Sequence, residues 1–358
     1  MQLASVNINI YANNQIPPAF ETNNAINIVF CPDNQYIKYF SILLQSIIDN
    51  ANPAKKYDLL VFETEFSDYN KKLLLRMLPS NFSLRFINIT EYINENFGNL
   101  EFYSKKYWSI ATYYRLFIPF IMQKYKKVLY LDSDMCVNNN IDELFNTNFE
   151  DKNIIAVSDT VSSILSYKID RKNYMQEILN LKHPESYFNA GLVLFNLENI
   201  KIEEYKTSLL KAFNIPNLWF CDQDILNIIF EGKTKLIHNK WNFMLDGLRN
   251  KNFLHQIVGD YRENYIEAKE NPCIIHYSGK LKPWNKPNIE YSDVFWKYAR
   301  KTPFYEEIIF SNIEKAKSKK NGIKYKPLEY IISLRNQKAH KILTILGLKF
   351  KFKRKNIN

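Results

Sequence analysis

The sequence predicts an α/β fold with a mostly parallel sheet and flanking helices. Three observations support this class. Short apolar stretches typical of strands alternate with helical patterns, and parallel strands need such crossover connections. Residues 128–131 form an uninterrupted apolar run, which is typical of a strand buried on both faces. Of the 358 residues 46% are hydrophobic, enough for one large domain with an appendage.

The predicted elements follow one another in a regular order. A first strand at 26–31 ends in a turn at Pro32 and Asp33, and apolar residues at helical spacing predict a helix from Tyr36 onward. The further predicted elements are, in order, strand 57–62, helix 67–78, strand 84–89, helix 109–117, strand 128–131, strand 154–158, helix 225–230 and strand 273–275.

Two carboxylates, Asp132 and Asp134, follow the apolar run 128–131 with Ser133 between them. Ligands of open α/β sheets bind at the carboxyl ends of the strands. Two carboxylates placed there repel each other unless a cation lies between them, and Mg²⁺ or Mn²⁺ typically shares such a site with substrate phosphates. The alternative is a strand-ending turn with two solvated aspartates, because Asp-x-Asp is short and recurs by chance.

Two later stretches also carry polar groups beside predicted strands or helices. Asn189, Ala190 and Gly191 precede a buried strand, where small residues let a ligand approach while the amide bonds its hydroxyl groups. Residues 222–224, Asp-Gln-Asp, precede the helix 225–230; acids and amides at a helix start also serve as ordinary caps.

His276 follows the strand 273–275 and precedes Gly279 and Lys282. This arrangement offers a metal-binding imidazole, a glycine turn and a lysine able to face a phosphate, although a lone histidine also commonly has a purely structural role. The chain lacks the glycine-rich signatures of dinucleotide and P-loop sites and has only eight glycines. We therefore expect metal and side chains to hold any phosphate.

Six stretches, in this order, resemble glycosyltransferase family 8, particularly bacterial galactosyl- and glucosyltransferases that build the lipopolysaccharide outer core. They are 29–36, 112–116, 129–134, 188–191, 222–227 and 276–284. The resemblance implies a Rossmann-like GT-A catalytic domain at 26–285, after an N-terminal extension at 1–25. Tyr107 stands where related galactosyltransferases carry a histidine on the acceptor side, which puts the acceptor sugar in doubt.

The resemblance also implies a retaining transfer of galactose or glucose from UDP-galactose or UDP-glucose to a glycan acceptor such as lipopolysaccharide or lipo-oligosaccharide core. Asp132, Asp134 and His276 would bind Mn²⁺, with Mg²⁺ as the alternative. Asp33 and Tyr36 would hold uridine. The remaining residues implied to contact the donor are Cys31, Arg115, Ser133, Asp159, Asn189, Ala190, Asp222, Gln223, Gly279 and Lys282.

The catalytic candidates are Gln223, Asp222 and Asp159. By resemblance Gln223 lies where a nucleophile is expected, but an amide oxygen is a poor nucleophile. We therefore favour front-face attack, in which the leaving phosphate accepts the acceptor's proton, with Asp222 as the rival nucleophile. A haloacid-dehalogenase-like phosphatase and a non-catalytic sugar-binding module are the alternative functions. The phosphatase motif requires Thr or Val where this chain has Cys136.

The C-terminal region, 286–358, is predicted to be helical and basic. Residues 315–358 contain 14 Lys and Arg against one acid, Glu329, and so carry the net positive charge of the whole chain. Apolar residues at helical spacing over 328–346 predict a basic amphipathic helix that binds an anionic membrane surface. A solvated helical appendage is the alternative. We do not expect nucleic-acid binding, because the rest of the chain shows no basic binding motif.

Four widely spaced cysteines, each in or beside an apolar run, predict reduced and buried thiols; they are Cys31, Cys136, Cys221 and Cys273. Residues 1–24 lack the pattern of a signal peptide, and no apolar run approaches 18 residues. We therefore expect a cytoplasmic protein at the inner face of the cytoplasmic membrane, where lipid-linked glycan acceptors are found.

Overall fold

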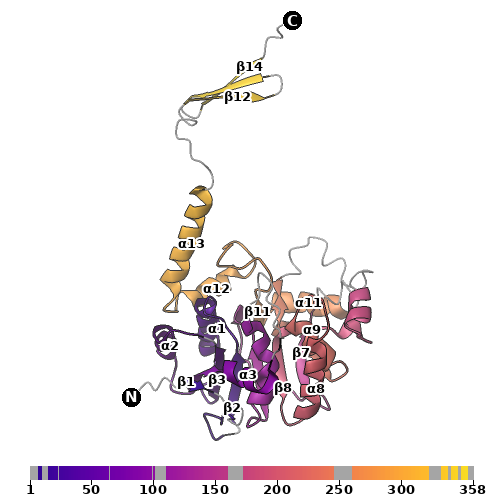
Figure 1. Ribbon diagram of the computed structural model, residues 1–358. Coiled ribbons are helices and arrows are strands. Elements are labelled where there is room, and N and C mark those ends of the chain that lie inside the picture. The colour runs from indigo at the N-terminus through magenta and orange to yellow at the C-terminus, as the bar shows by residue number, and fades with distance from the viewer. Residues whose placement is uncertain are drawn as a thin grey trace. The chain divides into compact units, whose positions relative to one another are not determined.

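The computed structural model describes two compact units, residues 1–305 and 306–358 (Figure 1). Tyr107 and residues 160–171 and 246–259 lie outside the described residues. The described ranges are 7–9, 15–22, 24–63, 65–98, 100, 110–159, 172–245, 260–321, 332–337, 340–345 and 348–353.

An eight-stranded sheet forms the centre of the first unit, with strand order β1-β4-β3-β2-β5-β8-β7-β9. All neighbours are parallel except β8, which runs antiparallel to both β5 and β7. The mostly parallel α/β prediction is confirmed. The strands are β1 Asn7–Asn9, β2 Ala25–Phe30, β3 Lys56–Glu63, β4 Phe82–Asn88, β5 Lys127–Leu131, β7 Ile154–Ser158, β8 Phe188–Asn196 and β9 Thr234–Ile237.

Helices cover both faces of this sheet (Figure 1). α1, α2 and α5 pack on one face, and α3, η1, α8 and α9 pack on the other. The helical elements are α1 Ile37–Asp49, α2 Asp68–Leu75, α3 Thr90–Phe97, η1 Ile110–Phe117, α4 Ile118–Ile121, α5 Asp142–Phe145, η2 Tyr174–Ile178, η3 Pro184–Ser186, α8 Ile202–Phe213, α9 Asp222–Ile229, η4 Asn239–Trp241, α11 Asp260–Glu270, α12 Ser292–Ala299 and α13 Tyr305–Asn321.

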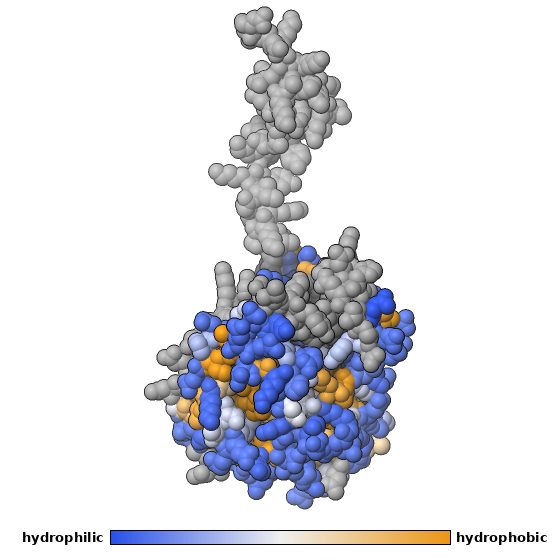
Figure 2. All heavy atoms as spheres, turned by 90° about the vertical axis from the view of Figure 1, so that its right-hand side faces the viewer, coloured by the Kyte–Doolittle hydropathy of each residue, from blue (hydrophilic) through white to orange (hydrophobic). Residues whose placement is uncertain are grey.

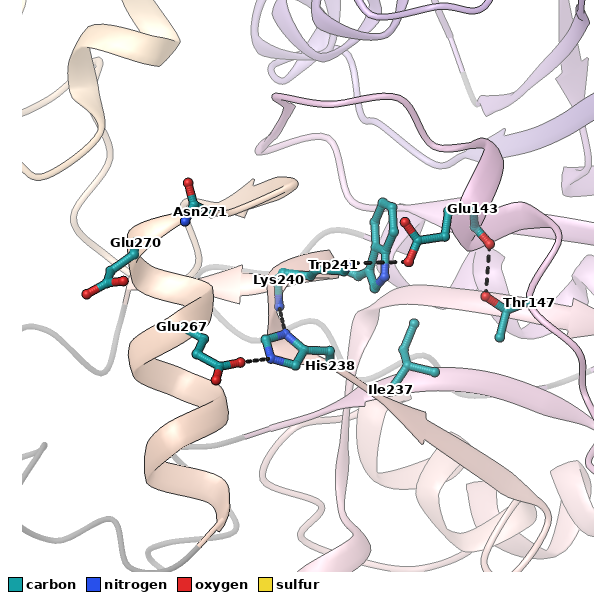
Figure 3. Close-up of a pocket in the computed structure, with 9 residues that line it drawn as sticks. All are labelled: Glu143, Thr147, Ile237, His238, Lys240, Trp241, Glu267, Glu270 and Asn271. Atoms are coloured by element: carbon teal, nitrogen blue, oxygen red, sulfur yellow. Dashed lines mark hydrogen bonds and ion pairs between the residues drawn. The ribbon is translucent and has the colours of Figure 1, made fainter.

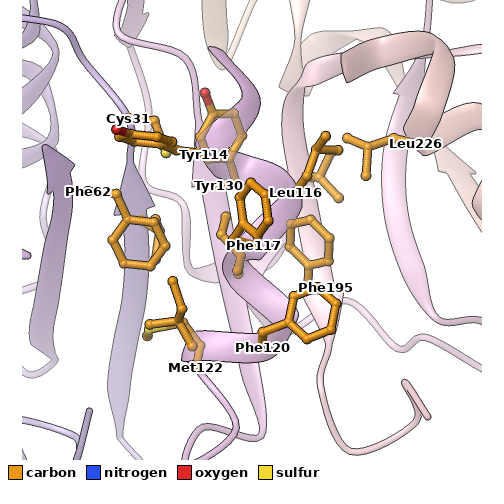
Figure 4. Packing of buried hydrophobic residues seen from close by; sticks show 14 of the residues in the cluster. Cys31, Phe62, Tyr114, Leu116, Phe117, Phe120, Met122, Tyr130, Phe195 and Leu226 are labelled. Carbon is orange, nitrogen blue, oxygen red and sulfur yellow. The ribbon is translucent and has the colours of Figure 1, made fainter. Parts of the chain in front are cut away.

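Alternate residues of the central strands enter two separate hydrophobic clusters. On β5, Val128 and Tyr130 belong to one cluster and Leu129 and Leu131 to the other. Because side chains on a strand alternate between faces, an uninterrupted apolar run requires cover on both sides. Figure 4 shows Tyr130 in the first cluster, packed among residues of η1 and the neighbouring strands. The strand predicted at 128–131 is therefore confirmed as doubly buried.

Two helix predictions need correction. The helix predicted at 225–230 begins earlier, so that Asp222, Gln223 and Asp224 form the first turn of α9 instead of preceding it. Cys221, the residue immediately before α9, has a positive φ of 47°. The segment predicted as a helix at 109–117 is the 3₁₀ helix η1.

A small second sheet lies beside the end of β5. Its strands are β6 Met135–Val137, β10 Phe243–Met244 and β11 Ile274–His276, in the order β10-β11-β6. The antiparallel register pairs His276 with Met135, the residue after Asp134. This pairing brings the end of β11 to the end of β5, although the two are far apart in the sequence.

The pairing of β7 with β8 contains an irregularity. Ala156 pairs with Val193, whereas the next residue, Val157, pairs with Asn189. Residues 190–192 of β8 therefore have no register partner on β7. Such bulges commonly occur next to active sites, where they redirect backbone or side-chain groups.

The predicted N-terminal extension, 1–25, contributes to the central sheet. β1 pairs in parallel with β4, and the carbonyl oxygen of Pro17 accepts a hydrogen bond of 2.7 Å from Arg85 on β4. Arg85 also forms an ion pair of 2.8 Å with Asp58, and the backbone N–H of Ala19 donates to the same carboxylate. Residues 17–19 are thus tied to the sheet by a buried ion pair.

The second unit differs from the predicted amphipathic helix. After α13 the described residues form a three-stranded antiparallel sheet of β12 Ile332–Gln337, β13 His340–Ile345 and β14 Leu348–Lys353. The helix predicted over 328–346 is therefore wrong where the structure describes the chain. Lysines at 349, 351 and 353 alternate with phenylalanines at 350 and 352, and this period of two is a strand pattern.

Hydrophilic side chains predominate on the face shown in Figure 2, and the apolar residues there form separate patches. Within the described part of the chain, none of the helices has both the length and the apolar character needed to span a bilayer. All four cysteines are free and buried, as expected.

Replacing Asp58 tests the buried ion pair. Asp58→Ala leaves the Arg85 guanidinium buried without its carboxylate, and we expect the free energy of unfolding to fall by about 3–5 kcal/mol in urea titrations. As a control, Glu204→Ala removes the exposed Lys201–Glu204 pair and should cost less than about 1 kcal/mol. Equal losses in the two variants would contradict this account.

Candidate functional site

Three side chains suited to metal binding meet at the carboxyl end of β5. One ligand atom from each of Asp132, Asp134 and His276 lies within 4.8 Å of the others. His276 Nε2 lies 3.2 Å from Asp134 Oδ1 and 3.7 Å from Asp132 Oδ2. The imidazole is 4% exposed and the carboxylates 23% and 14%, so the alternative of two solvated aspartates does not describe them.

Each of the two carboxylates is matched by a cation and further polar contacts. Arg115 Nη2 lies 2.8 Å from Asp132 Oδ1, which also accepts a hydrogen bond of 2.7 Å from the Tyr130 hydroxyl. Lys282 forms an ion pair with Asp134 and donates to the carbonyl of Tyr277. Burial alone would raise the pKa of Asp134, but Lys282 and His276 outweigh it and hold that pKa well below its usual range. Asp134 is therefore ionised.

Arg115 connects the Asp132 carboxylate to the start of α9. It is buried, lies with its guanidinium 4.5 Å from the centre of the Tyr130 ring, and donates to the carbonyl of Ala190 over 2.7 Å. Its Nε lies 3.0 Å from Asp222 Oδ2. Burial raises the pKa of Asp222 to about 7 even though Arg115 lowers it. One guanidinium thus holds a half-buried acid, Asp132, and a buried one, Asp222, from different parts of the chain.

Backbone N–H groups at the start of β8 orient two side-chain amides. The N–H of Ala190 and the Nδ2 of Asn189 both donate to Gln223 Oε1, each over 3.1 Å. The N–H of Gly191 donates to Asn189 Oδ1 over 3.0 Å. Gln223 Nε2 in turn donates to Asp159 Oδ2 over 2.9 Å. Gln223 is therefore held at both ends of its amide.

Cys221, just before α9, has the left-handed φ of 47° that only glycine adopts easily. Such backbone costs about 1–3 kcal/mol and persists only where the surrounding structure enforces it. Here it sets the start of α9, so that Asp222 and Gln223 lie in the first turn beside Arg115 and Asn189. The local strain therefore coincides with the catalytic candidates.

Gly191 gives the cluster the space it needs. A Cβ at this position would lie 2.6 Å from His276 Cε1, 2.7 Å from Asp132 Oδ2 and 2.8 Å from Asn189 Oδ1. Real Cβ atoms essentially never approach other atoms within 3.0 Å, so the neighbouring groups would have to move. Small residues at this place were expected to let a ligand approach, and the side chains of the site itself also need this room.

The residues predicted to hold uridine lie beside the last of the six stretches. Asp33 Oδ1 accepts hydrogen bonds from the N–H groups of Gln35 and Tyr36, both over 2.9 Å. The Tyr36 ring meets Trp284 edge-on at 6.2 Å, and Tyr39 stacks on the same indole at 3.8 Å. The first and last stretches are thereby packed together.

The other predicted donor-site residues differ in their exposure. Cys31 is buried in the hydrophobic cluster, where desolvation raises the pKa of its thiol far above the usual range (Figure 4). Ser133 is half-buried between the two aspartates, and Gly279 is exposed with a φ of 72° that favours glycine. Asp159 is buried at the end of β7.

Sequence reasoning missed Asn242, which is fully buried between η4 and β10. Its Nδ2 donates to Asn189 Oδ1 over 2.9 Å, and its Oδ1 lies 2.9 Å from His276 Nδ1. The available signal was a polar residue between two large aromatic ones, Trp241 and Phe243. Sequence reasoning also missed the hydroxyl of Tyr130, since its position in an apolar run suggested only packing.

A cleft of about 650 Å³ lies apart from this cluster (Figure 3). Two pairs of its charged groups contact each other: His238 and Glu267 at 3.2 Å, and Lys240 and Glu143 at 3.1 Å. None of the predicted site residues lines it. The cleft is lined by Glu143, Thr147, Ile237, His238, Lys240, Trp241, Glu267, Glu270 and Asn271. We place the functional site at the Asp132–Asp134–His276 cluster, where acids, cations and a buried imidazole converge.

Comparison with known proteins points to one family. The family described as glycosyl transferase family 8 matches residues 27–287. The chain is 27% identical to the lipopolysaccharide 1,3-galactosyltransferase of Salmonella typhimurium over 267 residues, covering 72% of this chain and 73% of that enzyme. It is 25% identical to a lipopolysaccharide 1,2-glucosyltransferase of Escherichia coli over 275 residues, covering 75% and 76% of the two chains.

A solved structure shares the fold. The galactosyltransferase LgtC, solved in complex with donor and acceptor sugar analogues, matches with a TM-score of 0.62–0.63 and 23% sequence identity. The match covers 78% of this chain and 96% of that one. At this level of identity the likeness concerns the fold alone.

Substituting Gly191 tests the packing of the cluster. Gly191→Ala forces apart the His276 ring and the Asp132 carboxylate, so we expect Mn²⁺ affinity to fall about 10–100-fold, the range found when groups that orient metal ligands are lost. Gly232→Ala is the control: it strains a left-handed turn (φ 71°), which Gly191→Ala does not, but its Cβ meets nothing within 4 Å. Unchanged Mn²⁺ affinity in Gly191→Ala would contradict the crowding.

Proposed function

The chain belongs to glycosyl transferase family 8, and from this premise we propose that it is a retaining, metal-dependent hexosyltransferase. It would move galactose or glucose from a UDP-sugar to a glycan acceptor such as lipopolysaccharide or lipo-oligosaccharide core. The observation that carries the proposal is the convergence of Asp132, Asp134 and His276 beside Arg115 and Lys282 at the carboxyl end of β5.

The donor set fits a divalent cation. Two carboxylates and one imidazole approach a common point, and the described residues of the site include five acids but only two permanent cations. The acids are Asp33, Asp132, Asp134, Asp159 and Asp222, and the cations are Arg115 and Lys282. An imidazole ligand favours Mn²⁺ over Mg²⁺, which prefers oxygen ligands. A bound metal would stabilise the negative charge that develops on the departing diphosphate.

The side chains around this point divide the remaining tasks. We assign Lys282 and the backbone of Gly279 to the diphosphate, since Lys282 already lies against Asp134. Asp33 and Tyr36 are assigned to the uridine, supported by their packing beside Trp284. The donor sugar is assigned to the side where Arg115, Asn189 and Asp222 meet.

The contacts of Gln223 support front-face attack. Its Oε1 already accepts two hydrogen bonds, from Asn189 and from the N–H of Ala190, and this engagement further weakens a poor nucleophile. We propose that the acceptor hydroxyl attacks the anomeric carbon from the same face on which the phosphate departs. The leaving phosphate accepts the proton of that hydroxyl. Asp222, buried against Arg115, is the rival nucleophile. Asp159 holds the Gln223 amide in place.

The basic second unit suggests where the enzyme works. We propose that 306–358 binds the anionic inner face of the cytoplasmic membrane, where lipid-linked acceptors are found. The support is that 315–358 contain 14 Lys and Arg but one acid. Each cation near such a surface contributes about 1 kcal/mol to binding. Neither alternative function, phosphatase or sugar-binding module, has an observation in its favour.

Asp134→Asn tests the proposed chemistry. Losing this negative charge weakens metal binding, and we expect UDP release from UDP-galactose or UDP-glucose with Mn²⁺ to fall by at least about 10²–10³-fold. Circular dichroism would check that the fold is retained. Asp49→Asn, which neutralises an acid paired with Lys301 outside the site, is the matched control. Near-normal turnover by Asp134→Asn would refute the assignment of Asp134 as a metal ligand.

Comparing UDP release from UDP-galactose and from UDP-glucose by the wild-type protein would identify the sugar that is transferred.

A chain ending at Glu314 tests the membrane role. Without the basic residues of 315–358 we expect loss of co-sedimentation with phosphatidylserine vesicles, whereas UDP release in solution should persist. Binding of the full chain should weaken at high salt, because the attraction is electrostatic. Vesicles of neutral phosphatidylcholine serve as the control. Unchanged co-sedimentation after truncation would refute the proposal.

A further inference from the structure

Asn242 contacts a metal-ligand candidate, His276, and is itself fully buried. Its side chain is 0% exposed, so both ends of its amide must find partners inside the protein. One end meets Asn189 Oδ1 and the other meets His276 Nδ1, each at 2.9 Å. A residue in this position can determine which nitrogen of His276 carries a hydrogen.

Backbone donors fix the direction of the whole amide chain. A backbone N–H can only donate, so the N–H of Gly191 marks the oxygen of Asn189 and the N–H of Ala190 marks the oxygen of Gln223. Since Asn189 presents its oxygen, the group of Asn242 that faces it must be the NH₂. The oxygen of Asn242 therefore faces His276.

An amide oxygen can only accept a hydrogen bond, so Nδ1 of His276 must carry the hydrogen. In the neutral ring this leaves the lone pair on Nε2, the nitrogen that lies 3.2 Å from Asp134 Oδ1 and 3.7 Å from Asp132 Oδ2. A lone pair facing two carboxylates is repelled unless a cation lies between them. The arrangement therefore suits a ligand nitrogen directed at a metal.

We propose that Asn242 is a positioning residue that holds His276 in the Nδ1–H tautomer and thereby commits Nε2 to the metal. Histidine ligands commonly donate their second N–H to an oxygen in this way, and losing that partner typically costs 10–100-fold in metal affinity. The choice of Mn²⁺ rests on the proposed function, whereas the tautomer follows from the hydrogen-bond directions alone.

The tautomer is measured on the metal-free full chain. Histidine labelled with ¹⁵N gives separate long-range correlations for the two ring nitrogens, and these show which nitrogen carries hydrogen. We expect Nδ1 of His276 to carry hydrogen in the wild-type protein. Asn242→Ala should move hydrogen from Nδ1 toward Nε2, giving the Nε2–H form or a mixture. A wild-type ring with hydrogen on Nε2 alone would overturn the proposal, whatever reaction the enzyme performs.

Metal affinity gives the second readout, through the electron paramagnetic resonance signal of free Mn²⁺. Asn242→Ala should bind Mn²⁺ about 10–100-fold more weakly than the wild type. Asn242→Asp keeps an oxygen toward Nδ1 but loses the NH₂ that faces Asn189 Oδ1, so it should retain the Nδ1–H form even if its Mn²⁺ affinity falls. Wild-type affinity in Asn242→Ala, or an Asp variant whose Nδ1 lacks the hydrogen, would refute positioning.

Asn50→Ala separates positioning from a general loss of packing. Asn50 donates to the carbonyls of Ser46 and Val137 and to the hydroxyl of Tyr298, and it contacts none of the proposed site residues. Its removal should lower stability but leave the His276 spectrum and Mn²⁺ affinity unchanged. If Asn50→Ala changed both as strongly as Asn242→Ala, the role of Asn242 would be structural only.

Discussion

The site depends on one electrostatic constraint: two carboxylates stand side by side at the end of a buried strand. The side chains of Asp132 and Asp134 are only 23% and 14% exposed, because β5 is buried on both faces and His276 of β11 lies against both carboxylates. Arg115 neutralises one acid and Lys282 the other. These cations come from stretches on either side of β5, so the long-range contacts of the fold serve to bring charge to this point.

Much of this arrangement could be predicted from the sequence. Residues 128–131 had to be a doubly buried strand because no polar residue interrupts them, and aspartates at the end of a parallel strand had to lie at the binding edge. The place of His276 after a strand and before Gly279 suggested a metal-binding imidazole, but only the resemblance to family 8 tied it to Asp132 and Asp134. The register of β11 against β6 makes that link, and register across distant strands is not visible in one sequence.

Other features depend on contacts that a single sequence does not reveal. Asn242 occurs in an aromatic stretch with no motif, and only its two partners show its role. The prediction of a helix over 328–346 was wrong because apolar residues at helical spacing can also fit strands. The alternation of lysine and phenylalanine at 349–353 is a strand pattern, but only the positive charge of these residues entered the prediction. The N-terminal strand β1 gave no signal, since three polar-rich residues suffice to extend a sheet edge.

The irregular pairing of β7 with β8 has an energetic consequence. Between Asn189 and Val193 the sheet gives up regular ladder bonds, and the N–H groups of Ala190 and Gly191 bond side-chain oxygens instead. On a regular strand successive residues direct their N–H groups to opposite neighbours, and Gly191 already faces β5 through its carbonyl, which accepts from the N–H of Asp132. A regular pairing would therefore engage only the N–H of Ala190 with β7, which would tighten the sheet there. It would also take from Gln223 Oε1 one of its two donors, so added stability at this strand pair would loosen the order of the candidate site.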